Sequence, residues 1–139
     1  MLLSAHAHNV LFLEASIHLF HPSLDILRAA LPRLGPLRRV ALVYNQYSSR
    51  YDKFKQGVVE NAFDPELSNG ALMDIGVYCV QLMTALFGAP RSICAKAVRL
   101  SNGVDGQGCI VAEYDGMLAE LSYSKISNAP IDSVIQGEE

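Results

Sequence analysis

The apolar residues of the chain are concentrated in one stretch, residues 69–87, which has helical signals at both ends. Ser68 or Asn69 would serve as the N-cap, and Gly88 followed by Pro90 is typical of a helix end. Between these signals the apolar positions go round the whole cylinder. This pattern predicts a helix that is buried on every side.

Three polar residues interrupt this apolar helix. Asp74, Tyr78 and Gln81 are spaced i, i+4 and i+7, so we expect them to form one polar stripe. A buried carboxylate is costly unless it is partnered, so another element should face the stripe. Two interpretations stay open. Asp74 could bond a neighbouring loop beside a core tyrosine, or it could orient a phenol that acts as an acid or base beside a pocket.

The segments before the helix give weaker patterns. Residues 1–8 could be the last turns of a helix, and Val10–Ala15 is an apolar run that suits a strand buried on both faces. Ser23–Leu31 has helical spacing, and Leu37–Tyr47 alternates as a strand does. Residues 48–69 mix polar and aromatic side chains without a period, which predicts a long loop of the kind that is often functional.

Three strands are predicted after the helix, at Ser92–Leu100, Gly108–Tyr114 and Met117–Ile126. Asp115-Gly116 is a strong signal for a two-residue hairpin between the last two. Residues 128–139 begin another extended segment. The partial alternation predicts an α+β fold, an open and mainly antiparallel sheet with helices on one face.

Composition and charge narrow the classes of partner. A chain of 139 residues that is half hydrophobic can bury one modest core. Its net charge of −3, with both signs interspersed, gives no basic patch for nucleic acid or an anionic membrane. Asp74 and Gln81 interrupt the apolar run, so we expect no membrane span. Cys79, Cys94 and Cys109 have no close spacing and are expected to be buried, reduced thiols of a cytoplasmic protein, and no residue cluster has metal-ligand spacing.

Residues 63–79 read Phe-Asp-Pro-Glu-Leu-Ser-Asn-Gly-Ala-Leu-Met-Asp-Ile-Gly-Val-Tyr-Cys. They resemble the signature of the Gfo/Idh/MocA oxidoreductases, in which Asn/Asp-Pro-Glu-Leu precedes a glycine pair and Leu-Leu/Met-Asp-x-Gly-x-Tyr or His. Asn9–Ala15, Phe20–Pro22 and Ile135–Glu139 also look like landmarks of that family.

The resemblance implies a domain organisation. Val10–Ala15 resembles the last strand of a Rossmann nucleotide-binding domain, so residues 1–20 would be the remnant of that domain. Residues 21–139 would be an α+β substrate and oligomerisation domain that is truncated at its C-terminus. The chain would then be an internal fragment that is catalytically inactive alone.

The resemblance also implies a chemistry. In the family a hydride passes between C4 of a nicotinamide and a hydroxyl-bearing carbon, usually of a sugar, polyol or related diol. Tyr78 matches the acid/base and Asp74 its orienting carboxylate, and Tyr rather than His favours the dihydrodiol dehydrogenase and glucose–fructose oxidoreductase branch. A cation nearby would stabilise the phenolate, whereas an anionic Asp74 favours a neutral donor. The family's cation is a lysine in a Glu-Lys-Pro motif, which does not occur here.

The implied cofactor is NAD or NADP, with Glu14 and Gly70 as contacts. The main cofactor site would be missing, because the chain has no Gly-x-Gly-x-x-Gly turn. Arg50 and Tyr51 in the long loop, together with Asn69, are the predicted substrate contacts. Asn69 stands where the family often has the first of its two glycines.

Two further positions stand out. Gly76 costs a helix about 1 kcal/mol relative to alanine, so close packing is expected there. After Glu14-Ala15 the family commonly has an aromatic and a basic residue, whereas this chain has Ser16-Ile-His-Leu19. His18 is either a polar contact that replaces them or incidental.

Two non-catalytic functions also stay open. Members of the family commonly associate through the open face of the sheet, so the chain could serve as a homo-oligomerisation domain. It could also be a ligand-binding module that uses a cavity beside the central helix. The expected partners are therefore a sugar, polyol or diol and a second copy of the chain, with no nucleic acid and no membrane.

Overall fold

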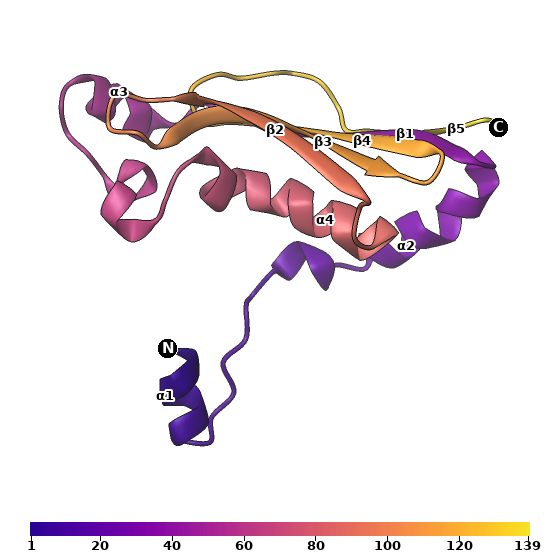
Figure 1. Ribbon diagram of the computed structural model, residues 1–139, viewed down its shortest axis with the longest axis horizontal. Coiled ribbons are helices and arrows are strands. Elements are labelled where there is room, and N and C mark those ends of the chain that lie inside the picture. The colour runs from indigo at the N-terminus through magenta and orange to yellow at the C-terminus, as the bar shows by residue number, and fades with distance from the viewer.

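A five-stranded sheet organises the computed structural model of residues 1–139 (Figure 1). Its strands are β1 (Leu37–Asn45), β2 (Ser92–Arg99), β3 (Asp105–Tyr114), β4 (Met117–Ser124) and β5 (Val134–Gly137). The spatial order is β2-β3-β4-β1-β5, in which only the β1–β4 pair is parallel. The predicted open, mainly antiparallel sheet is therefore confirmed, and the two-residue hairpin pairs Tyr114 with Met117 as expected.

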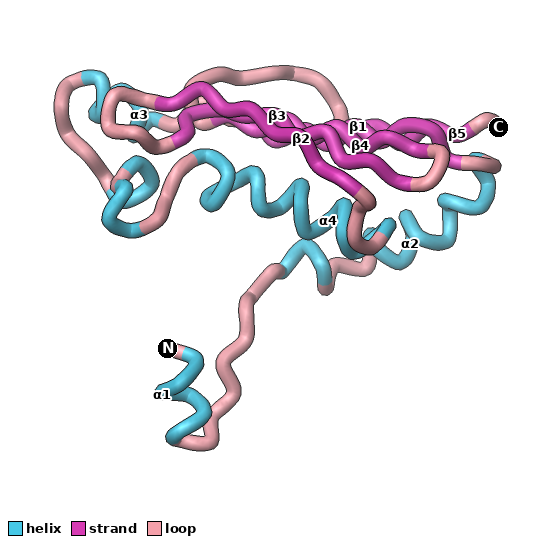
Figure 2. Tube along the Cα trace, viewed as in Figure 1, coloured by secondary structure: helices cyan, strands magenta, loops and turns pink.

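The four α-helices are placed differently relative to this sheet (Figure 2). They are α1 (Leu2–Ala7), α2 (Ser23–Ala30), α3 (Ser49–Lys55) and α4 (Val77–Phe87), with a π-helical turn at Leu72–Gly76 and 3-10 turns at Ile17–Leu19, Leu31–Leu34, Asn61–Phe63 and Pro65–Leu67. α2 and α4 lie on one face of the sheet, α3 lies at one end of it and α1 lies apart from it (Figure 1). The loop between β4 and β5 crosses the opposite face (Figure 1). The sheet with helices on one face matches the predicted α+β class.

The strand expected at Val10–Ala15 does not form. These residues are exposed and have no neighbouring strand in the sheet. A strand depends on the backbone hydrogen bonds of a partner strand, and an apolar run without one stays irregular. The region leads from α1 to the turn at Ile17–Leu19 (Figure 1).

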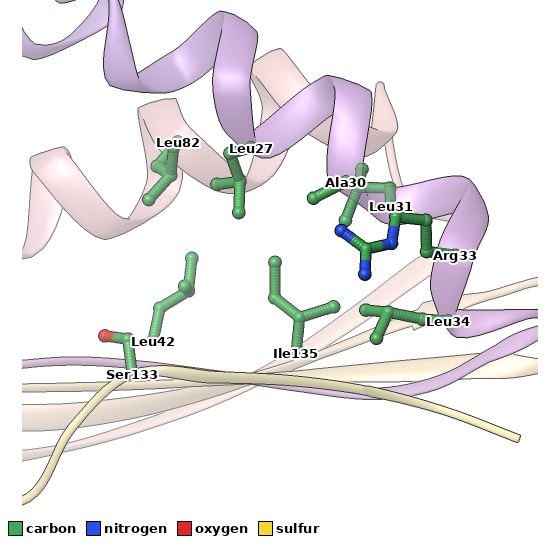
Figure 3. A pocket seen from close by; sticks show the side chains of 9 residues that line it. All are labelled: Leu27, Ala30, Leu31, Arg33, Leu34, Leu42, Leu82, Ser133 and Ile135. Atoms are coloured by element: carbon green, nitrogen blue, oxygen red, sulfur yellow. The ribbon is translucent and has the colours of Figure 1, made fainter. Parts of the chain in front are cut away.

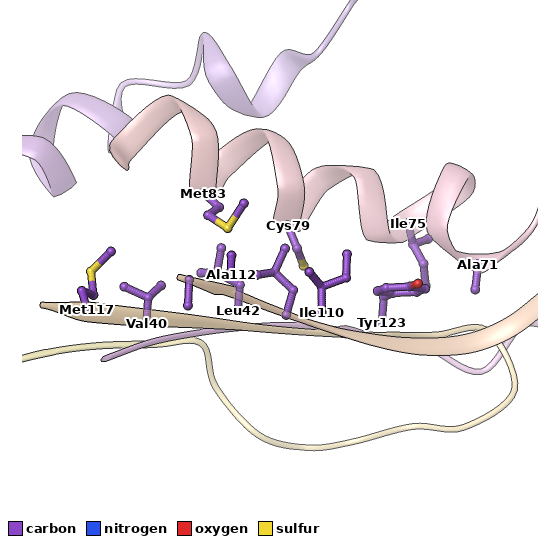
Figure 4. Packing of buried hydrophobic residues seen from close by; sticks show 12 residues of the cluster. Val40, Leu42, Ala71, Ile75, Cys79, Met83, Ile110, Ala112, Met117 and Tyr123 are labelled. Atoms are coloured by element: carbon purple, nitrogen blue, oxygen red, sulfur yellow. The ribbon is translucent and has the colours of Figure 1, made fainter. Parts of the chain in front are cut away.

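α4 and the π turn bury one row of side chains against the sheet (Figure 4). The row consists of Ala71, Ile75, Cys79 and Met83, and the facing sheet residues include Val40, Leu42, Ile110, Ala112, Leu121 and Tyr123. The prediction of a helix buried on all sides is wrong, because Met73 is 59% exposed and Tyr78 39% exposed. The helix packs on the sheet along one face, and no second layer covers the other completely.

The same helical region is apolar enough to be compared with a membrane span. An 18-residue window within Pro65–Phe87 has a mean hydropathy of 1.5, and the segment is long enough to span a membrane, contrary to the expectation from Asp74 and Gln81. Core helices of soluble proteins meet the same criteria, and this one packs on a sheet. The composition of this helix is therefore weak support for a membrane span.

The start of the central helix differs from the prediction. Ser68 adopts a left-handed conformation with φ of 55°, and the amide of Asn69 donates to the Asn61 carbonyl at 2.7 Å. Neither residue caps the helix. The carboxylate of Asp105 at the start of β3 instead accepts a hydrogen bond from the Leu72 N–H at 2.7 Å. Gly88 ends the helix as predicted, with φ of 75°.

Residues 48–69, predicted as a loop, contain α3 and two 3-10 turns. Side-chain caps begin two of these elements. The Ser48 hydroxyl accepts from the Arg50 N–H at 3.3 Å, and the Asp64 carboxylate accepts from the Glu66 N–H at 3.0 Å. Elements this short leave no hydrophobic period, so local capping was the available signal.

The three cysteines differ in exposure according to the side of the sheet on which they lie. Cys79 on α4 is buried, but Cys94 on β2 and Cys109 on β3 are exposed, so the prediction of three buried thiols is wrong for two. Alternate residues of a strand point to opposite faces, and these two lie on the face away from α4. All three thiols are free.

Candidate functional site

The predicted polar stripe is divided between two environments. Asp74 lies in the π-helical turn and binds Lys125, whereas Tyr78 follows this turn and contacts the rings of His18 and Tyr44. A π turn contains one residue more than an α turn, so residues on either side of it do not keep the α-helical i, i+4 alignment. Asp74 and Tyr78 accordingly share no hydrogen bond. Asp74 does not orient the phenol directly.

Lys125 is the buried cation of this region. It follows β4, is only 5% exposed, and donates from its ammonium group to Oδ2 of Asp74. The ammonium also lies 5.9 Å from the ring centre of Phe63, which is fully buried. The Asp74 side chain is 37% exposed, and its Oδ1 accepts no hydrogen bond within the chain. One carboxylate oxygen is thus held while the other is open.

The backbone of Lys125 is held from two sides. Its N–H donates to the Gly106 carbonyl at 2.9 Å, and its carbonyl accepts from the Ser48 N–H at 2.9 Å. These hydrogen bonds join the end of β4 to β3 and to the start of α3. The lysine therefore enters the site from a fixed backbone, which limits the positions that its ammonium group can reach.

Tyr78 lines a cavity of about 440 Å³ between α4, the end of β1 and the segment before β5. Its lining residues are His18, Leu42, Val43, Tyr44, Tyr78, Cys79, Leu82 and Ser133. The ring centre of His18 lies 5.0 Å from that of Tyr78, edge to face. The Tyr78 hydroxyl makes no hydrogen bond within the chain, and both ring nitrogens of His18 are buried without a partner. The cavity thus combines apolar walls with unpaired polar groups, a composition typical of small-molecule sites.

The thiol of Cys79 also borders this cavity. Burial raises its pKa to about 11, so it is neutral at physiological pH. A thiol in that state is a poor nucleophile. Cys79 therefore contributes packing and no covalent chemistry.

A larger cavity of about 470 Å³ lies under α2 (Figure 3). Leucine and alanine side chains of α2 and of Leu31–Leu34 face Leu42 and Ile135 of the sheet across it, and Leu82 of α4 closes one side (Figure 3). Arg33 is its one charged lining residue. Because it shares Leu42, Leu82 and Ser133 with the Tyr78 cavity, it extends the available space, but it adds no group suited to proton transfer.

The two predicted cofactor contacts have partners within the chain. The Glu14 carboxylate accepts from the amide of Gln81 at 2.7 Å, which attaches the N-terminal segment to α4. Gly70 has φ of 155°, and a Cβ at this position would overlap the Asp105 carboxylate. Gly70 is therefore required by close packing around the helix cap, and its role toward a cofactor stays a prediction.

The predicted substrate contacts do not line the Tyr78 cavity. Tyr51 stacks within an aromatic cluster with Phe54 and Phe63, at ring-centre distances of 6.2 and 5.9 Å. Arg50 lies 3.8 Å from the Glu60 carboxylate. Asn69 is bound to its own loop. Their contact with substrate stays a prediction, but Tyr51 has a structural role because its cluster includes the ring beside Lys125.

Sequence reasoning did not single out Lys125. The sequence feature that could have identified it is its position directly after the alternating residues of β4. A lysine on the covered side of the sheet needs an anionic partner. His18 was considered only as a polar replacement, and the structure places it against Tyr78.

Comparison with known proteins gives a consistent result. Residues 31–139 match the GFO/IDH/MocA C-terminal domain. The chain is 48% identical over 139 residues to scyllo-inositol 2-dehydrogenase (NADP(+)) IolU of Bacillus subtilis (strain 168), covering 100% of this chain and 42% of that protein. It is 44% identical over 134 residues to the uncharacterized oxidoreductase YgjR of Escherichia coli (strain K12), covering 96% and 41%.

More distant relatives agree. Trans-1,2-dihydrobenzene-1,2-diol dehydrogenase of Xenopus tropicalis is 31% identical over 140 residues, covering 99% of this chain and 41% of that protein. The crystal structure of KijD10, a 3-ketoreductase from Actinomadura kijaniata, superposes with a TM-score of 0.79 at 21% identity, covering 96% and 40%, which shows a shared fold. The chain spans about two-fifths of the length of these relatives. The chain belongs to the Gfo/Idh/MocA family, and residues 31–139 correspond to the C-terminal domain of that family.

Proposed function

We propose that this chain supplies the proton-transferring and substrate-contacting part of an NAD(P)-dependent oxidoreductase. The substrate class is a sugar, a polyol or a trans-dihydrodiol. The names of two relatives support this proposal, since one acts on scyllo-inositol with NADP(+) and the other on a trans-dihydrodiol. Both substrates carry neighbouring hydroxyl groups on a ring.

One observation carries the proposal, namely the free Tyr78 hydroxyl at a cavity of about 440 Å³. Oxidation of an alcohol to a ketone removes a hydride from carbon and a proton from oxygen. Tyr78 would accept that proton as a phenolate and return it as a phenol in the reverse reaction. A phenol without a hydrogen-bond partner in the chain is free to bond the substrate oxygen.

The residues of this chain do not form a dinucleotide site. Such a site needs a glycine-rich turn between a strand and a helix, and the connection from β1 to α3, Gln46-Tyr47-Ser48, has no glycine. Glu14 accepts a hydrogen bond from Gln81, and Gly70 leaves no room for a Cβ beside the Asp105 carboxylate. The proposal therefore places the main cofactor site outside this chain and assigns to it the proton transfer and the substrate contacts, while cofactor contacts at Glu14 and Gly70 stay a prediction.

A hybrid enzyme tests the proposal. In this hybrid the present chain replaces the aligned residues of IolU, to which it is 48% identical. We expect scyllo-inositol-dependent formation of NADPH, and we expect Tyr78→Phe to lower kcat by at least about 100-fold, the usual contribution of general acid–base catalysis. Binding of NADP+ should not change.

Tyr114→Phe is the matched control, because the Tyr114 hydroxyl bonds the Gly88 carbonyl at 2.9 Å and does not line the cavity. This variant should keep kcat within about twofold. A Tyr78→Phe hybrid with unchanged kcat would refute the proposal. So would a parent hybrid that folds and binds NADP+ but produces no NADPH.

The open face of the sheet supports a second, non-catalytic function. Val98, Val111 and Leu118 lie on the face away from α4 and are 53%, 42% and 48% exposed. Exposed apolar side chains on a sheet face favour association with a second copy of the chain. Light scattering after gel filtration should give a dimer or larger assembly that Val111→Lys disrupts, and a monomer at high concentration would exclude this function.

A further inference from the structure

The Asp74–Lys125 pair has an asymmetry that bears on substrate recognition. Lys125 is 5% exposed, whereas the Asp74 side chain is 37% exposed. A buried ammonium group is costly unless an anion and further favourable contacts compensate for its lost hydration. Asp74 is the only carboxylate within ion-pair distance, and the fully buried ring of Phe63 lies below the ammonium group at 5.9 Å. The position of the cation is therefore determined by its surroundings.

The consequence for Asp74 is a fixed orientation. The carboxylate has two oxygens, and Oδ2 is held by Lys125 while Oδ1 accepts no bond within the chain. The backbone of Asp74 is fixed as well, since its N–H donates to the Gly70 carbonyl at 3.0 Å at the entry of the π turn. A charged acceptor with a fixed orientation binds a hydroxyl donor more strongly than a mobile one, because less conformational entropy is lost.

We infer that Lys125 is a positioning residue: it holds Asp74 by one oxygen so that the other accepts a hydrogen bond from a hydroxyl group of the substrate. This inference rests on the proposed function, and it adds that the recognised hydroxyl differs from the one that Tyr78 serves. Two hydroxyls at separate points favour a polyol or diol over a compound with a single alcohol group. The anionic acceptor disfavours substrates that carry a carboxylate at that point.

The IolU hybrid allows a direct test with scyllo-inositol as the probe. Lys125→Met removes the charge but keeps a side chain of similar length, and the Asp74 carboxylate that loses its partner is 37% exposed, so water can hydrate it. We expect KM to rise by about tenfold or more, the loss associated with one hydrogen bond to a charged group. Because this bond forms in the ground state and the transition state alike, kcat should change less than KM. Lys96→Met is the matched control, since Lys96 on β2 is exposed and forms no ion pair.

A double-mutant cycle separates positioning from structural support. If Lys125 acts through Asp74, then Lys125→Met should add less than about twofold to KM in an Asp74→Asn background. A purely structural role would raise KM equally in both backgrounds. If Lys125→Met fails to fold, Lys125→Gln takes its place in the cycle. The glutamine amide can still donate a hydrogen bond to Asp74, so we expect KM to rise less in Lys125→Gln than in Asp74→Asn.

The outcomes are distinct from those of the proposed function. An increase in KM that persists in the Asp74→Asn background, or a KM unchanged within twofold in Lys125→Met, overturns the positioning role even where Tyr78→Phe abolishes turnover. Unchanged turnover in Tyr78→Phe overturns the proposed function instead.

Discussion

Gly76→Ala gives a sharp test of the packing between the central helix and the sheet. In an ordinary helix this substitution stabilises by about 1 kcal/mol, because alanine has the higher helix propensity. Here a Cβ at position 76 would lie 2.7 Å from Cγ and 2.9 Å from Cδ1 of the Tyr123 ring. Contacts below 3 Å require a movement of the helix, the ring or both.

Neither group can move freely. Tyr123 is 3% exposed and lies on β4, which is paired on both sides by β3 and β1. The far end of its ring is blocked as well, because its hydroxyl lies directly over Gly108 of β3. Overpacking of a core costs about 1–3 kcal/mol, and a ring confined at both ends belongs at the upper end. Subtracting the gain in propensity leaves a net loss of about 2 kcal/mol in the free energy of unfolding.

Urea and thermal unfolding of the chain, followed by circular dichroism, measure this loss. For a domain of this size about 2 kcal/mol lowers Tm by about 7 °C. Thr84→Ala on the exposed side of α4 is the control. It also raises helix propensity, and an alanine at this exposed position does not pack against the sheet. A Gly76→Ala variant as stable as the parent, or more stable, would refute the claim that the Tyr123 ring requires glycine at this position.

Two further predictions concern the thiols. Burial raises the pKa of Cys79 from 9.0 to about 11, so its contribution to stability is complete below about pH 9 and is lost as the pH rises toward 11, by up to about 3 kcal/mol. Urea unfolding across this range should show the decline, and Cys79→Ala should make it shallower, whereas an equal decline in both proteins would contradict the assignment. Cys94 and Cys109 are exposed, so Ellman's reagent should titrate two thiols rapidly in the native chain and the third only after unfolding, and three fast thiols would disagree with a buried Cys79.

Much of the sheet could be predicted because its signals are local. β3 and β4 show alternation and are joined by Asp115-Gly116, so their pairing follows from adjacent residues. The parallel pairing of β1 with β4 has no such signal, because it joins Arg39–Asn45 to Leu118–Ser124 across the whole helical segment. The start of the central helix was predicted wrongly for a similar reason. The carboxylate that accepts the Leu72 N–H belongs to Asp105 of β3, which is distant in the sequence.

The candidate site was predictable only in part. The signature around Asp74 and Tyr78 identified the two residues but placed them on one stripe, because an α-helical period was assumed. A π turn has no reliable mark in the sequence, and its extra residue separates the two side chains. Lys125 and His18 reach the site through tertiary contacts with Asp74 and Tyr78, which single-sequence patterns do not contain.

The position of β1 in the sheet has a consequence for biosynthesis. β1 leaves the ribosome before both of its neighbours, because β4 and β5 are made at least about 70 residues later, and non-local pairing of this kind forms slowly. During that interval the nascent chain presents an apolar strand with two unpaired edges, Val40 and Leu42 included, which is a template for aggregation. The hairpin of β3 and β4 forms from adjacent residues as soon as it is synthesised. The strand that we expect to need protection from aggregation during translation is therefore β1, an interior strand that is paired on both sides once folding is complete.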